Sequence, residues 1–490
     1  MKYLLGIDFG GGASKATLLS EKGEICATAT YEYPTNYPCP GYAEQDPEDW
    51  VKATCTNIKS VLEKSGVSPE SIAAISLDAA THTAVIMDKD FNIIRPAIYW
   101  TDTRSKAEVQ YLRENYSDII DKQVLHKADT IWSLPELMWI KNNEPENWSK
   151  VNKILFAKDY VRHRLTGDYV TDYIEAEGSM MFDINTMKWS EELCGILDIS
   201  TDMMPEIVSP SDIAGSITKD ASILTGLPEG TPVLCGTTDT VMEVFASGAV
   251  AKGQMTLKLA TAGRICVITD KAYPDINLIN YSHIVPGLFY PGTATKSCAA
   301  SYRWFRDTFG EDYEALNEKA ASVPIGSEGM VFHPYLNGEL TPYANPNLCA
   351  DFVGVRASHT KAHFTRAVLE GVTMSMLDCK TALDKLNIPH DDCAVIIGGG
   401  SKSPLWRQMI ADALNIKLVV MKHADSSFGS AMLAGIATGI FESPAQAVEM
   451  CNTVVSETVP NAENTEKYAQ LFKKYKAVQK ALEPIYNGEF

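Results

Sequence analysis

The sequence predicts an α/β protein built from two related halves. Strand-like and helix-like stretches alternate along nearly the whole chain, which is typical of an α/β architecture. Residues 3–19 and 254–269 also share one pattern, in which a strand leads through a turn of small residues into a second strand. Two related halves would produce this echo, although hairpins are so common that chance explains it equally well.

The N-terminal half opens with predicted strands at 3–9, 15–19 and 25–31. A helix is expected to follow Asp46, because Asp is favoured as N-cap and Pro47 suits the first helical position. Apolar side chains then recur at helical spacing at Val51, Cys55, Ile58, Val61 and Leu62. Next we expect a strand at 72–77 and a hairpin that joins 84–87 to 93–98.

Near the middle of the chain, a strand at 232–235 precedes a helix that begins near Thr240 and ends within 245–249. A boundary at this helix end divides the chain into domains 1–246 and 247–490. Beyond the hairpin at 254–269 we expect a strand at 394–397, a helix that follows it, and an amphipathic helix over 465–482.

Composition and charge exclude several classes of protein. The 490 residues carry 43 Lys and Arg against 62 Asp and Glu, a net charge of 43 − 62 = −19. A chain this acidic is a poor partner for nucleic acid or an anionic membrane. No apolar run reaches the ~18 residues of a membrane span, and no secretory leader is recognisable, so we expect a cytoplasmic protein. The eleven cysteines lack C-x-x-C spacing, which favours reduced thiols.

Common nucleotide and hydrolase motifs are absent. The chain has no G-x-x-x-x-G-K-[ST] and no complete G-x-G-x-x-G, so neither a P-loop nor a dinucleotide fingerprint is present. H-E-x-x-H and G-x-S-x-G are also missing.

The most informative motif is the end of the first strand and the turn after it. A carboxylate ends a buried strand, and glycines with exposed N–H groups, a hydroxyl and a cation follow. These residues are Asp8, Gly10, Gly11, Gly12, Ser14 and Lys15. Backbone donors with one cation can hold a phosphate, while Asp8 can hold an accompanying Mg²⁺ through water. The alternative is a glycine-rich hairpin in which Asp8 is a turn residue.

Two later segments also end strands with small or acidic residues. Asp239 follows the strand at 232–235, at the end where α/β sheets bind ligands, although Asp is equally common as a helix N-cap. Gly398, Gly399 and Gly400 stand between a strand and a helix, where backbone can approach an anionic or flat ligand. A simple strand-to-helix turn needs only one glycine.

A fourth segment suits a sugar. Thr81-His82-Thr83 follows the strand at 72–77, and Trp100 and Asp102 lie downstream. Polar side chains can pair with hydroxyl groups, and an indole can cover a carbon chain. A lone His is more often structural, so this segment is weak evidence by itself.

Together these segments resemble the FGGY family of carbohydrate kinases, and within it most closely the xylulokinase branch. The resemblance spans nearly the whole chain and keeps the family's order. Further matching blocks lie at 44–50, 95–102, 157–160, 333–342, 366–372 and 398–408.

The resemblance implies two ribonuclease H-like domains of the actin and hexokinase type, with a cleft between them. Domain 1–246 would bind the sugar and domain 247–490 the nucleotide. The implied activity is ATP-dependent phosphorylation of a small sugar at a terminal hydroxyl, above all a pentulose such as D-xylulose. The alternatives are ribulose, gluconate, glycerol or erythritol as substrate, or a non-catalytic nucleotide-binding protein. A homodimer is the default expectation.

The resemblance also assigns roles to residues. Asp239 would be the general base and, with Asp8, would lie at the Mg²⁺ end of the phosphates. Sugar contacts are implied for Thr81 and His82, then for Trp100, Asp102 and Thr240. Contacts with ATP are implied for the first turn, Gly10 to Lys15, and for Thr261, Gly263, Trp304, Gly399, Gly400 and Ser403.

The chain departs from the family pattern at several positions. The first turn, usually Gly-Thr-Ser or Gly-Thr-Thr, is Gly10-Gly11-Gly12 and offers only backbone donors. The second, usually Gly-Thr-Ser-Gly, is Ala260-Thr261-Ala262-Gly263. Thr83 replaces the Gly of a Met-His-Gly signature, and Thr240 stands where Asn is frequent. These changes leave the predicted base intact but leave the sugar open.

Overall fold

The computed structural model describes residues 1–275 and 277–489, which form two compact units. Unit 1 comprises Met1–Gly248, Tyr281–Pro286 and His423–Asn452. Unit 2 comprises Ala249–Asn280, Gly287–Lys422 and Thr453–Phe490. A single cut between residues 246 and 247 does not account for the two later segments that pack with unit 1. The predicted interdomain cleft and the assignment of one ligand to each domain stay predictions.

Unit 1 is built on a seven-stranded sheet with the order β13-β14-β5-β1-β2-β3, in which β15 also pairs with β5. The strands are β1 (Tyr3–Phe9), β2 (Ala13–Ser20), β3 (Ile25–Glu32), β5 (Ile72–Ala79), β13 (Ile213–Ser216), β14 (Pro232–Leu234) and β15 (Thr237–Thr238). The three predicted N-terminal strands are confirmed. β5 runs parallel to β1, so their carboxyl ends meet at one edge of the sheet.

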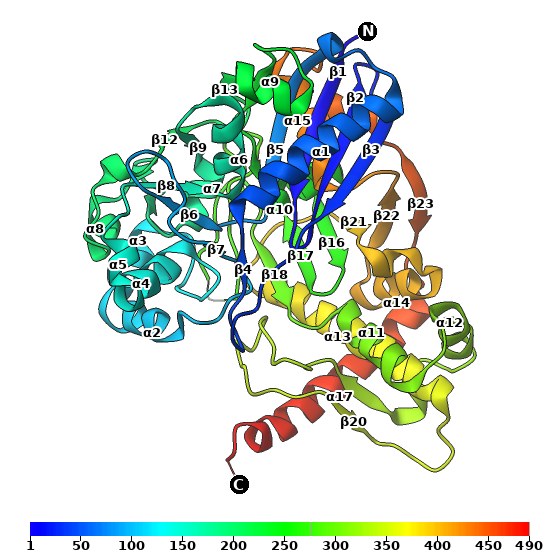
Figure 1. Ribbon diagram of the computed structural model, residues 1–490. Helices are drawn as coiled ribbons and strands as arrows, with labels where there is room; N and C mark the ends of the chain where they lie inside the picture. Colours follow the sequence, from blue (N-terminus) through cyan, green and yellow to red (C-terminus); the bar gives the residue numbers. More distant parts are fainter. Residues whose placement is uncertain (276, 490) are drawn as a thin grey trace. The chain divides into compact units, whose positions relative to one another are not determined.

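Helices cover both faces of this sheet (Figure 1). α1 (Pro47–Ser65) and α6 (Ala157–Thr166) cover one face, and α10 (Asp239–Ala246) and α15 (Ser426–Ala437) cover the other. Asp46 is the N-cap of α1, as predicted, and its side chain accepts a hydrogen bond from the backbone N–H of Glu48. The core between these layers is apolar and includes Leu5, Ile7 and Ile75.

The predicted hairpin of 84–87 with 93–98 forms only next to its turn, where the N–H of Ile94 donates to the carbonyl of Ile86. β6 (Ala84–Met87) pairs with β8 (Lys153–Phe156), and β7 (Ala97–Ile98) pairs with β4 (Glu44–Gln45). Only one isolated bridge joins Met87 to Ile93. Both short strands find distant partners, because buried apolar strands gain more from the core than from a local turn.

The rest of unit 1 consists of short elements. Its helices are η1 (Pro69–Ser71), α2 (Lys106–Asn115), α3 (Ser117–Gln123), α4 (Ser133–Asn143), α5 (Pro145–Trp148), α7 (Tyr173–Gly178), α8 (Glu191–Ile196), η2 (Thr201–Met203), α9 (Lys219–Thr225) and α16 (Pro444–Cys451). Its remaining strands are β9 (Val170–Asp172), β10 (Phe182–Asp183), β11 (Lys188–Trp189) and β12 (Glu206–Val208).

Unit 2 is built on a six-stranded sheet with the order β18-β17-β16-β21-β22-β23. The strands are β16 (Met255–Leu259), β17 (Gly263–Val267), β18 (Gly292–Thr295), β21 (Cys393–Ile397), β22 (Lys417–Met421) and β23 (Val454–Thr458). β16 and β17 form the second predicted hairpin, which is therefore confirmed.

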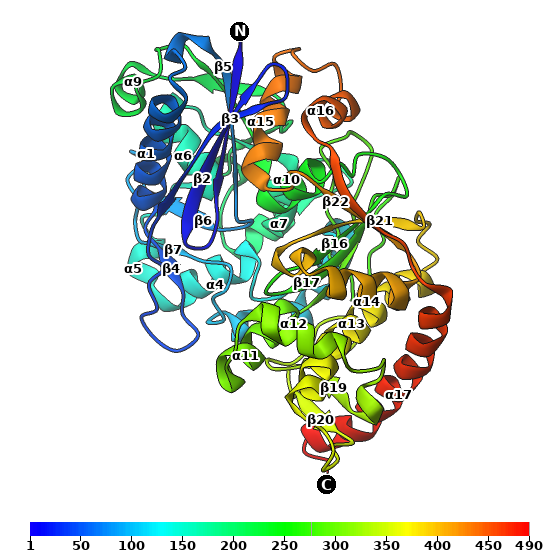
Figure 2. The same ribbon diagram turned by 90° about the vertical axis from the view of Figure 1, so that its right-hand side faces the viewer.

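The long helix α13 (Lys361–Lys385) packs against β17, β18 and α14 (Pro404–Leu414) (Figure 2). The C-terminal helix α17 (Ala462–Tyr486) packs on α14 and contains the helix predicted at 465–482. The remaining elements are α11 (Ala299–Phe309), α12 (Tyr313–Ala321), η3 (Ser327–Gly329), β19 (Val331–His333), β20 (Asp351–Val353) and η4 (Gly399–Lys402).

The two sheets share one pattern of strand directions. Along β3-β2-β1-β5-β14-β13 the pairings are antiparallel, antiparallel, parallel, parallel and antiparallel. The row β18-β17-β16-β21-β22-β23 repeats the same series. The echo in the sequence therefore reflects two sheets of the same design and not a coincidence of hairpins.

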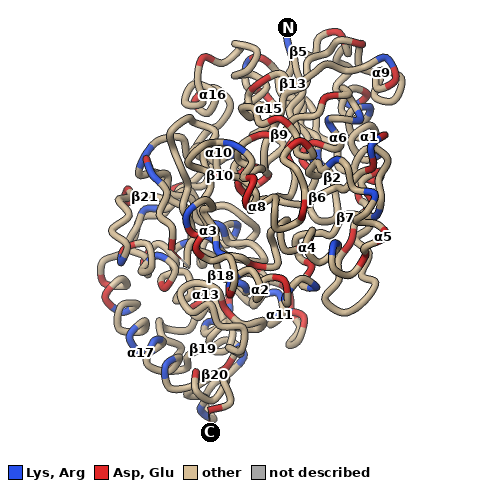
Figure 3. The backbone as a smooth tube through the Cα atoms, turned by 90° about the vertical axis from the view of Figure 1, so that its left-hand side faces the viewer, with Lys and Arg blue, Asp and Glu red and all other residues tan. Residues whose placement is uncertain are grey.

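The charged residues of both signs are interspersed along the chain (Figure 3). α17, for example, carries Glu463 and Glu466 in its first turns, then a series of lysines, and Glu483 near its end. Among the described residues, no helix is both long and apolar enough to cross a bilayer.

Candidate active site

Three acidic residues of unit 1 end neighbouring strands at one edge of its sheet. Asp8 in β1 lies in register with Asp78 in β5, and Asp78 lies in register with Thr237 in β15. Asp239 follows β15 directly as the first residue of α10. These strands are parallel, so their carboxyl ends bring the three side chains together at the edge where α/β sheets bind ligands.

Burial and mutual repulsion disfavour full ionisation of this cluster. The pKa of Asp8 is raised to about 7 by burial and then by the negative charge of Asp239. The pKa of Asp78 is also raised, by burial and by the nearby Asp8, and Ser430 donates a hydrogen bond to Asp78 Oδ2 at 2.5 Å. The buried Asp8 Oδ1 has no hydrogen-bond partner among the described residues.

A hydrated cation would satisfy these carboxylates. In the described part of the chain, no group of three or more His, Cys, Asp or Glu side chains is arranged to hold a metal ion by itself. Asp8 nevertheless offers an unpartnered oxygen beside a second carboxylate, and Mg²⁺ prefers one or two carboxylates together with waters and phosphates. The donor set therefore fits an Mg²⁺ ion that arrives with a phosphate compound.

Asp239 is not an N-cap, which was the alternative for this residue. Thr238 occupies the N-cap position of α10, and Asp239 is half-buried in the first turn. Its Oδ1 accepts a hydrogen bond from the hydroxyl of Thr240 at 3.1 Å. The carboxylate is thus oriented by Thr240 and does not cap the helix.

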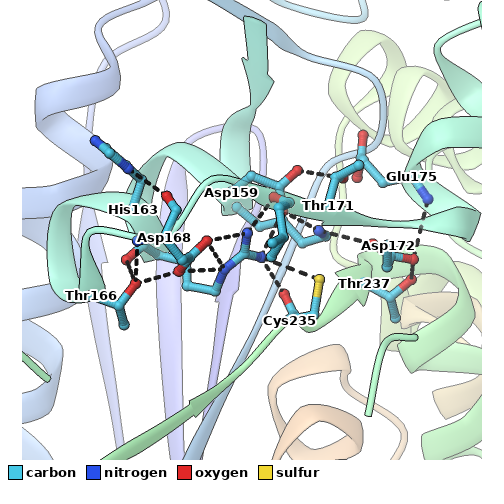
Figure 4. Close-up of polar contacts among 12 residues, drawn as sticks. Asp159, His163, Thr166, Asp168, Thr171, Asp172, Glu175, Cys235 and Thr237 are labelled. Carbon is cyan, nitrogen blue, oxygen red and sulfur yellow. Dashed lines mark hydrogen bonds and ion pairs between the residues drawn. The ribbon is translucent and has the colours of Figure 1, made fainter. Parts of the chain in front are cut away.

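A buried ion network supports the segment that carries Asp239 (Figure 4). Lys158 in α6 forms ion pairs with Asp159 and Asp172, and all three side chains are fully buried. Asp172 Oδ1 accepts a hydrogen bond from the Thr237 hydroxyl at 2.8 Å. Arg162 donates to the carbonyl of Cys235 at 2.7 Å. Charged side chains therefore hold the backbone on the N-terminal side of Asp239.

The same network reaches the loop after β5 through α7. Asp172 is the N-cap of α7, and Glu175 Oε1 in that helix accepts a hydrogen bond from the backbone N–H of His82 at 2.7 Å. His82 has a φ of 70°, an uncommon backbone conformation that this bond helps to hold. A Cβ atom on Gly178 would lie 1.7 Å from the His82 ring, so only glycine fits there.

The His82 side chain lies in an aromatic cluster. Its Nε2 is 2.7 Å from the hydroxyl of Tyr281, and its ring centre is 4.6 Å from that of Trp132. Tyr281 begins the segment 281–286, which joins unit 1 from the second half of the chain. Next to it, the backbone N–H and hydroxyl of Ser282 both donate to the buried carboxyl of Glu177.

Two polar residues of the first hairpin face different surroundings. Lys15 Nζ lies 3.1 Å from Oδ1 of Asp425, the N-cap of α15, on the same face of the sheet as that helix. Ser14 is fully buried on the opposite face, where Asn57 of α1 donates to its hydroxyl oxygen at 3.1 Å. Alternation along β2 therefore turns Ser14 away from Lys15, and we remove Ser14 from the candidate ligand residues.

The other predicted sugar contacts differ in availability. Asp102 is buried and its carboxylate is occupied by Arg104 and by the backbone N–H of Ala43, so its role is structural. The Trp100 side chain is 42% exposed, and Thr81 is half-buried. Trp100 and Thr81 therefore remain available to a ligand, whereas Asp102 is not available.

In unit 2, the turn between β16 and β17 lies against the start of α11. The carbonyls of Ala260 and Thr261 accept hydrogen bonds from the backbone N–H groups of Ala299 and Cys298. Gly263 is closely packed, because a Cβ there would lie 2.6 Å from the sulfur of Met376. The turn is therefore closely packed, and two of its carbonyls are engaged by the start of α11.

The glycine loop of unit 2 adjoins this turn. A Cβ on Gly398 would lie 2.5 Å from the carbonyl oxygen of Leu259, whereas one on Gly399 would meet nothing within 4 Å. Gly400 is buried against Trp406, and Ser403 caps α14 by accepting from the backbone N–H of that residue. Gly399 thus offers the open backbone of this loop.

Trp304 packs against the core of unit 2. Its ring lies 6.1 Å from that of Phe309 and 6.4 Å from that of Phe332. It is only partly buried, so one edge of the ring remains accessible.

Sequence reasoning missed Asp78, Glu175 and Tyr281. A signal was present for Asp78, because an acidic residue within the apolar stretch 72–79 is unusual without a function. Glu175 and Tyr281 act through partners 93 and 199 residues away, respectively, and no local pattern marks them.

Comparisons with known proteins show the family to which the chain belongs. The chain matches the N-terminal domain model of the FGGY family of carbohydrate kinases over residues 3–246 and the C-terminal domain model over 235–438. It is 32% identical over 483 residues to xylulose kinase from Bacillus subtilis (strain 168), covering 98% of this chain and 97% of the relative.

Two solved structures superimpose over the full length of both chains. Ligand-bound xylulose kinase from Lactobacillus acidophilus has a TM-score of 0.93 at 26% identity, and gluconate kinase from the same organism has 0.93 at 27%. The fold and the family resemblance expected from the sequence are therefore confirmed. The chain is a member of the FGGY family of carbohydrate kinases, an enzyme family that phosphorylates sugars.

Proposed function

We propose that this enzyme transfers the γ-phosphate of ATP to a terminal hydroxyl of a pentulose such as D-xylulose. The observation that carries the proposal is Asp239, a half-buried carboxylate oriented by Thr240 and placed beside the carboxylate of Asp8. A base next to a site for a hydrated cation is what phosphoryl transfer to a hydroxyl requires. The similarity to xylulose kinases supports the choice of acceptor.

In this proposal Asp239 accepts the proton of the acceptor hydroxyl as the oxygen attacks phosphorus. The ion network around Lys158 keeps the preceding backbone fixed, so the carboxylate is positioned before the substrate binds. Asp8 would hold Mg²⁺ through water. When bound, the ion would neutralise charge on the phosphates.

Nucleotide contacts are proposed for both hairpin turns and for the glycine loop. Gly11 and Gly12 would offer backbone N–H groups, since that of Gly10 donates to the carbonyl of Ala13, with Lys15 nearby as a cation partly neutralised by Asp425. In unit 2, the open backbone at Gly399 suits the adenosine side, with Gly400, Ser403 and the edge of Trp304 around it. Thr261 and Gly263 complete this set.

Sugar contacts are proposed for Thr81, His82 and Trp100, with Thr240 beside the base. The imidazole of His82 is fixed by Tyr281 and the backbone by Glu175, so the loop is rigid enough to select among acceptors. We drop Asp102 because Arg104 occupies its carboxylate.

Gluconate is the second candidate acceptor. The gluconate kinase structure matches this chain as closely as the xylulose kinase structure does. Acceptor choice depends on a few pocket contacts, which differ among members of one fold. We further infer a cytoplasmic enzyme of xylose metabolism, which the scattered cysteines and the names of the relatives support. A homodimer is proposed only because it is the commonest assembly.

An ADP-release assay tests the proposal. Purified protein with ATP and Mg²⁺ is given xylulose, ribulose, gluconate, glycerol or erythritol, and xylulose is expected to give the largest kcat/KM. Asp239→Asn should lower kcat by roughly 10² to 10⁴ while the fold remains intact, because only the proton acceptor is lost. Asp220→Asn, on the exposed side of α9, is the matched control and should change little.

Two outcomes would contradict this function. Full activity of Asp239→Asn would overturn the assignment of the base. Tight ATP binding without stimulation by any acceptor in the panel would instead favour a non-catalytic nucleotide-binding protein.

A further inference from the structure

The side chain of Tyr99 takes up the space beside Gly11 in the first hairpin turn. A Cβ atom on Gly11 would lie 2.8 Å from the hydroxyl oxygen of Tyr99, but 3.5 Å from Cζ and 3.6 Å from Cε1. The ring is therefore at ordinary contact distance, and the hydroxyl alone excludes a side chain. The backbone of Gly11 is not in the left-handed region, so its conformation does not demand glycine.

Tyr99 is held firmly in this position. Its backbone N–H donates to the carbonyl of Ala43 and its carbonyl accepts from the N–H of Asp102. Its side chain is 5% exposed and packs with Ala43 and Ala80. The hydroxyl cannot swing away from the turn without breaking this packing.

The Tyr99 hydroxyl is a hydrogen-bond donor with its proton unused. The side chain of Trp100 forms a hydrogen bond with it, and an indole N–H can only donate, so Tyr99 supplies the acceptor there. Within the described residues, no acceptor takes the Tyr99 proton. Burial and the negative charge of Asp239 raise the pKa of Tyr99, so the proton stays on the phenol at neutral pH.

The turn beside this hydroxyl is arranged as an anion site. The carbonyl of Gly10 accepts from the hydroxyl of Tyr33 at 2.6 Å, and that of Gly11 accepts from Thr35 and Gln45. In the described structure the N–H groups of Gly11 and Gly12 have no acceptor. Because these carbonyls already accept hydrogen bonds while two N–H groups have no acceptor, the turn attracts an oxyanion and repels a cation.

We propose that Tyr99 is a phosphate-binding residue, whose hydroxyl donates to a phosphoryl oxygen of ATP at the Gly10–Gly12 turn. From the position directly after β7, it supplies the hydroxyl that the resemblance leads one to expect on residue 11 of the turn itself. Residue 11 is then glycine because the hydroxyl of Tyr99 occupies the space that a side chain there would need. The proposal rests on the proposed kinase function and adds a residue that acts on the donor substrate.

Tyr99→Phe tests the hydroxyl with the ring kept in place. We expect weaker binding of ATP by calorimetry and a kcat/KM for ATP lower by about tenfold or more, since a hydrogen bond to a charged oxygen is lost. The KM for the sugar should not change. Trp100 is 42% exposed, so water can replace its lost partner. Tyr111→Phe, at a half-exposed tyrosine of α2, controls for the substitution itself.

A rescue experiment separates the hydroxyl from general damage. In Tyr99→Phe the Cβ of a serine at residue 11 would have the ring at 3.5 Å, an ordinary contact, so Tyr99→Phe/Gly11→Ser returns a hydroxyl to the turn. We expect it to recover several-fold in ATP affinity over Tyr99→Phe. Tyr99→Phe/Gly11→Ala fills the same space without a hydroxyl and should not recover. Gly11→Ser alone should bind ATP less tightly than the unaltered enzyme, because it displaces Tyr99.

Three results would overturn the proposal. Unchanged ATP binding and kinetics in Tyr99→Phe would show that Tyr99 does not contact the phosphate. A change in the sugar KM alone would assign Tyr99 to the acceptor. Equal recovery by Gly11→Ser and Gly11→Ala would show that space matters and the hydroxyl does not. ATP binding decides the proposal even if no sugar is phosphorylated, an outcome that would contradict only the proposed function.

Discussion

The two hairpins that open the two sheets share one topology but carry opposite charges at the same position. Asp8 stands one residue before the end of β1, and Lys258 stands one residue before the end of β16. Across the hairpin, Asp8 faces Lys15, whereas Lys258 faces Arg264. Unlike charges opposite each other stabilise a hairpin, and like charges destabilise it.

This difference shows that the repeated sheet sets the position of a side chain, whereas the residue at that position sets its chemistry. The sheet fixes where a side chain at the strand end will stand, and the two halves then use that place for different tasks. In unit 1 the place holds a carboxylate with a pKa raised to about 7, which suits a cation. In unit 2 it holds a lysine that lies opposite an arginine, and two cations suit an anion such as a phosphate.

The largest expected effect concerns the ions beneath the site of unit 1. Lys158→Met would leave Asp172 buried without its cation and Asp159 with Arg162 alone, and breaking a buried pair in this way costs about 3–5 kcal/mol of unfolding free energy. The comparison in unit 2 is Lys476→Met. Lys476 is 35% exposed, and the buried Asp378 with which it pairs keeps a hydrogen bond from Tyr343, so the loss of stability should be smaller. Urea unfolding followed by circular dichroism measures both.

Equal losses of stability in these two variants would contradict the ranking of the two ion pairs. A large loss for Lys158→Met with full retention of kcat in the folded fraction would refute the view that the network also positions Asp239.

The next effect tests the opposed charges directly. Asp8→Asn should lower activity by about 10–100-fold at limiting Mg²⁺ and less at high Mg²⁺, because a group that orients the hydrated ion is weakened. Lys258→Gln should instead raise the KM for ATP, by no more than about tenfold, with little change in the Mg²⁺ dependence. Initial rates over a grid of ATP and Mg²⁺ concentrations separate the two variants. The same Mg²⁺ dependence in both would remove the functional distinction between the hairpins.

Much of this fold was predictable because local signals agreed with tertiary packing. Asp46 and Pro47 mark the start of α1, and the three N-terminal strands are bounded by turn residues. The hairpin of 84–87 was predicted only in part: its turn forms, but β6 pairs along its length with β8, about 70 residues further on, which no local pattern signals.

The site was predictable to the extent that its residues lie at strand ends. Asp8 and Asp239 stand where a strand meets a turn, so their position alone pointed to chemistry. Ser14 was misjudged because alternation along β2 turns it toward α1. Tyr281 could not be foreseen, since its partnership with His82 spans 199 residues and exists only in the folded chain.

The smallest expected effect is a pH dependence that arises at the segment 281–286. Burial raises the pKa of Glu177, which holds Ser282, from 4.5 to about 8. The folded protein therefore binds this proton more tightly than the unfolded chain does. The resulting stability is fully present below pH 4.5 and is lost as the pH rises through about 8. Glu177→Gln, which stays neutral, should lack this loss.

The melting temperature of Glu177→Gln relative to the unaltered protein should thus rise between pH 5 and pH 9 by a few degrees. Glu63→Gln, at an exposed position of α1, controls for the change of charge and should show no such trend. If the difference in melting temperature stays constant across this range, the ionisation of Glu177 does not cause the loss of stability. A trend of the predicted sign would show that the segment contributed by the second half of the chain is held most firmly when Glu177 is protonated.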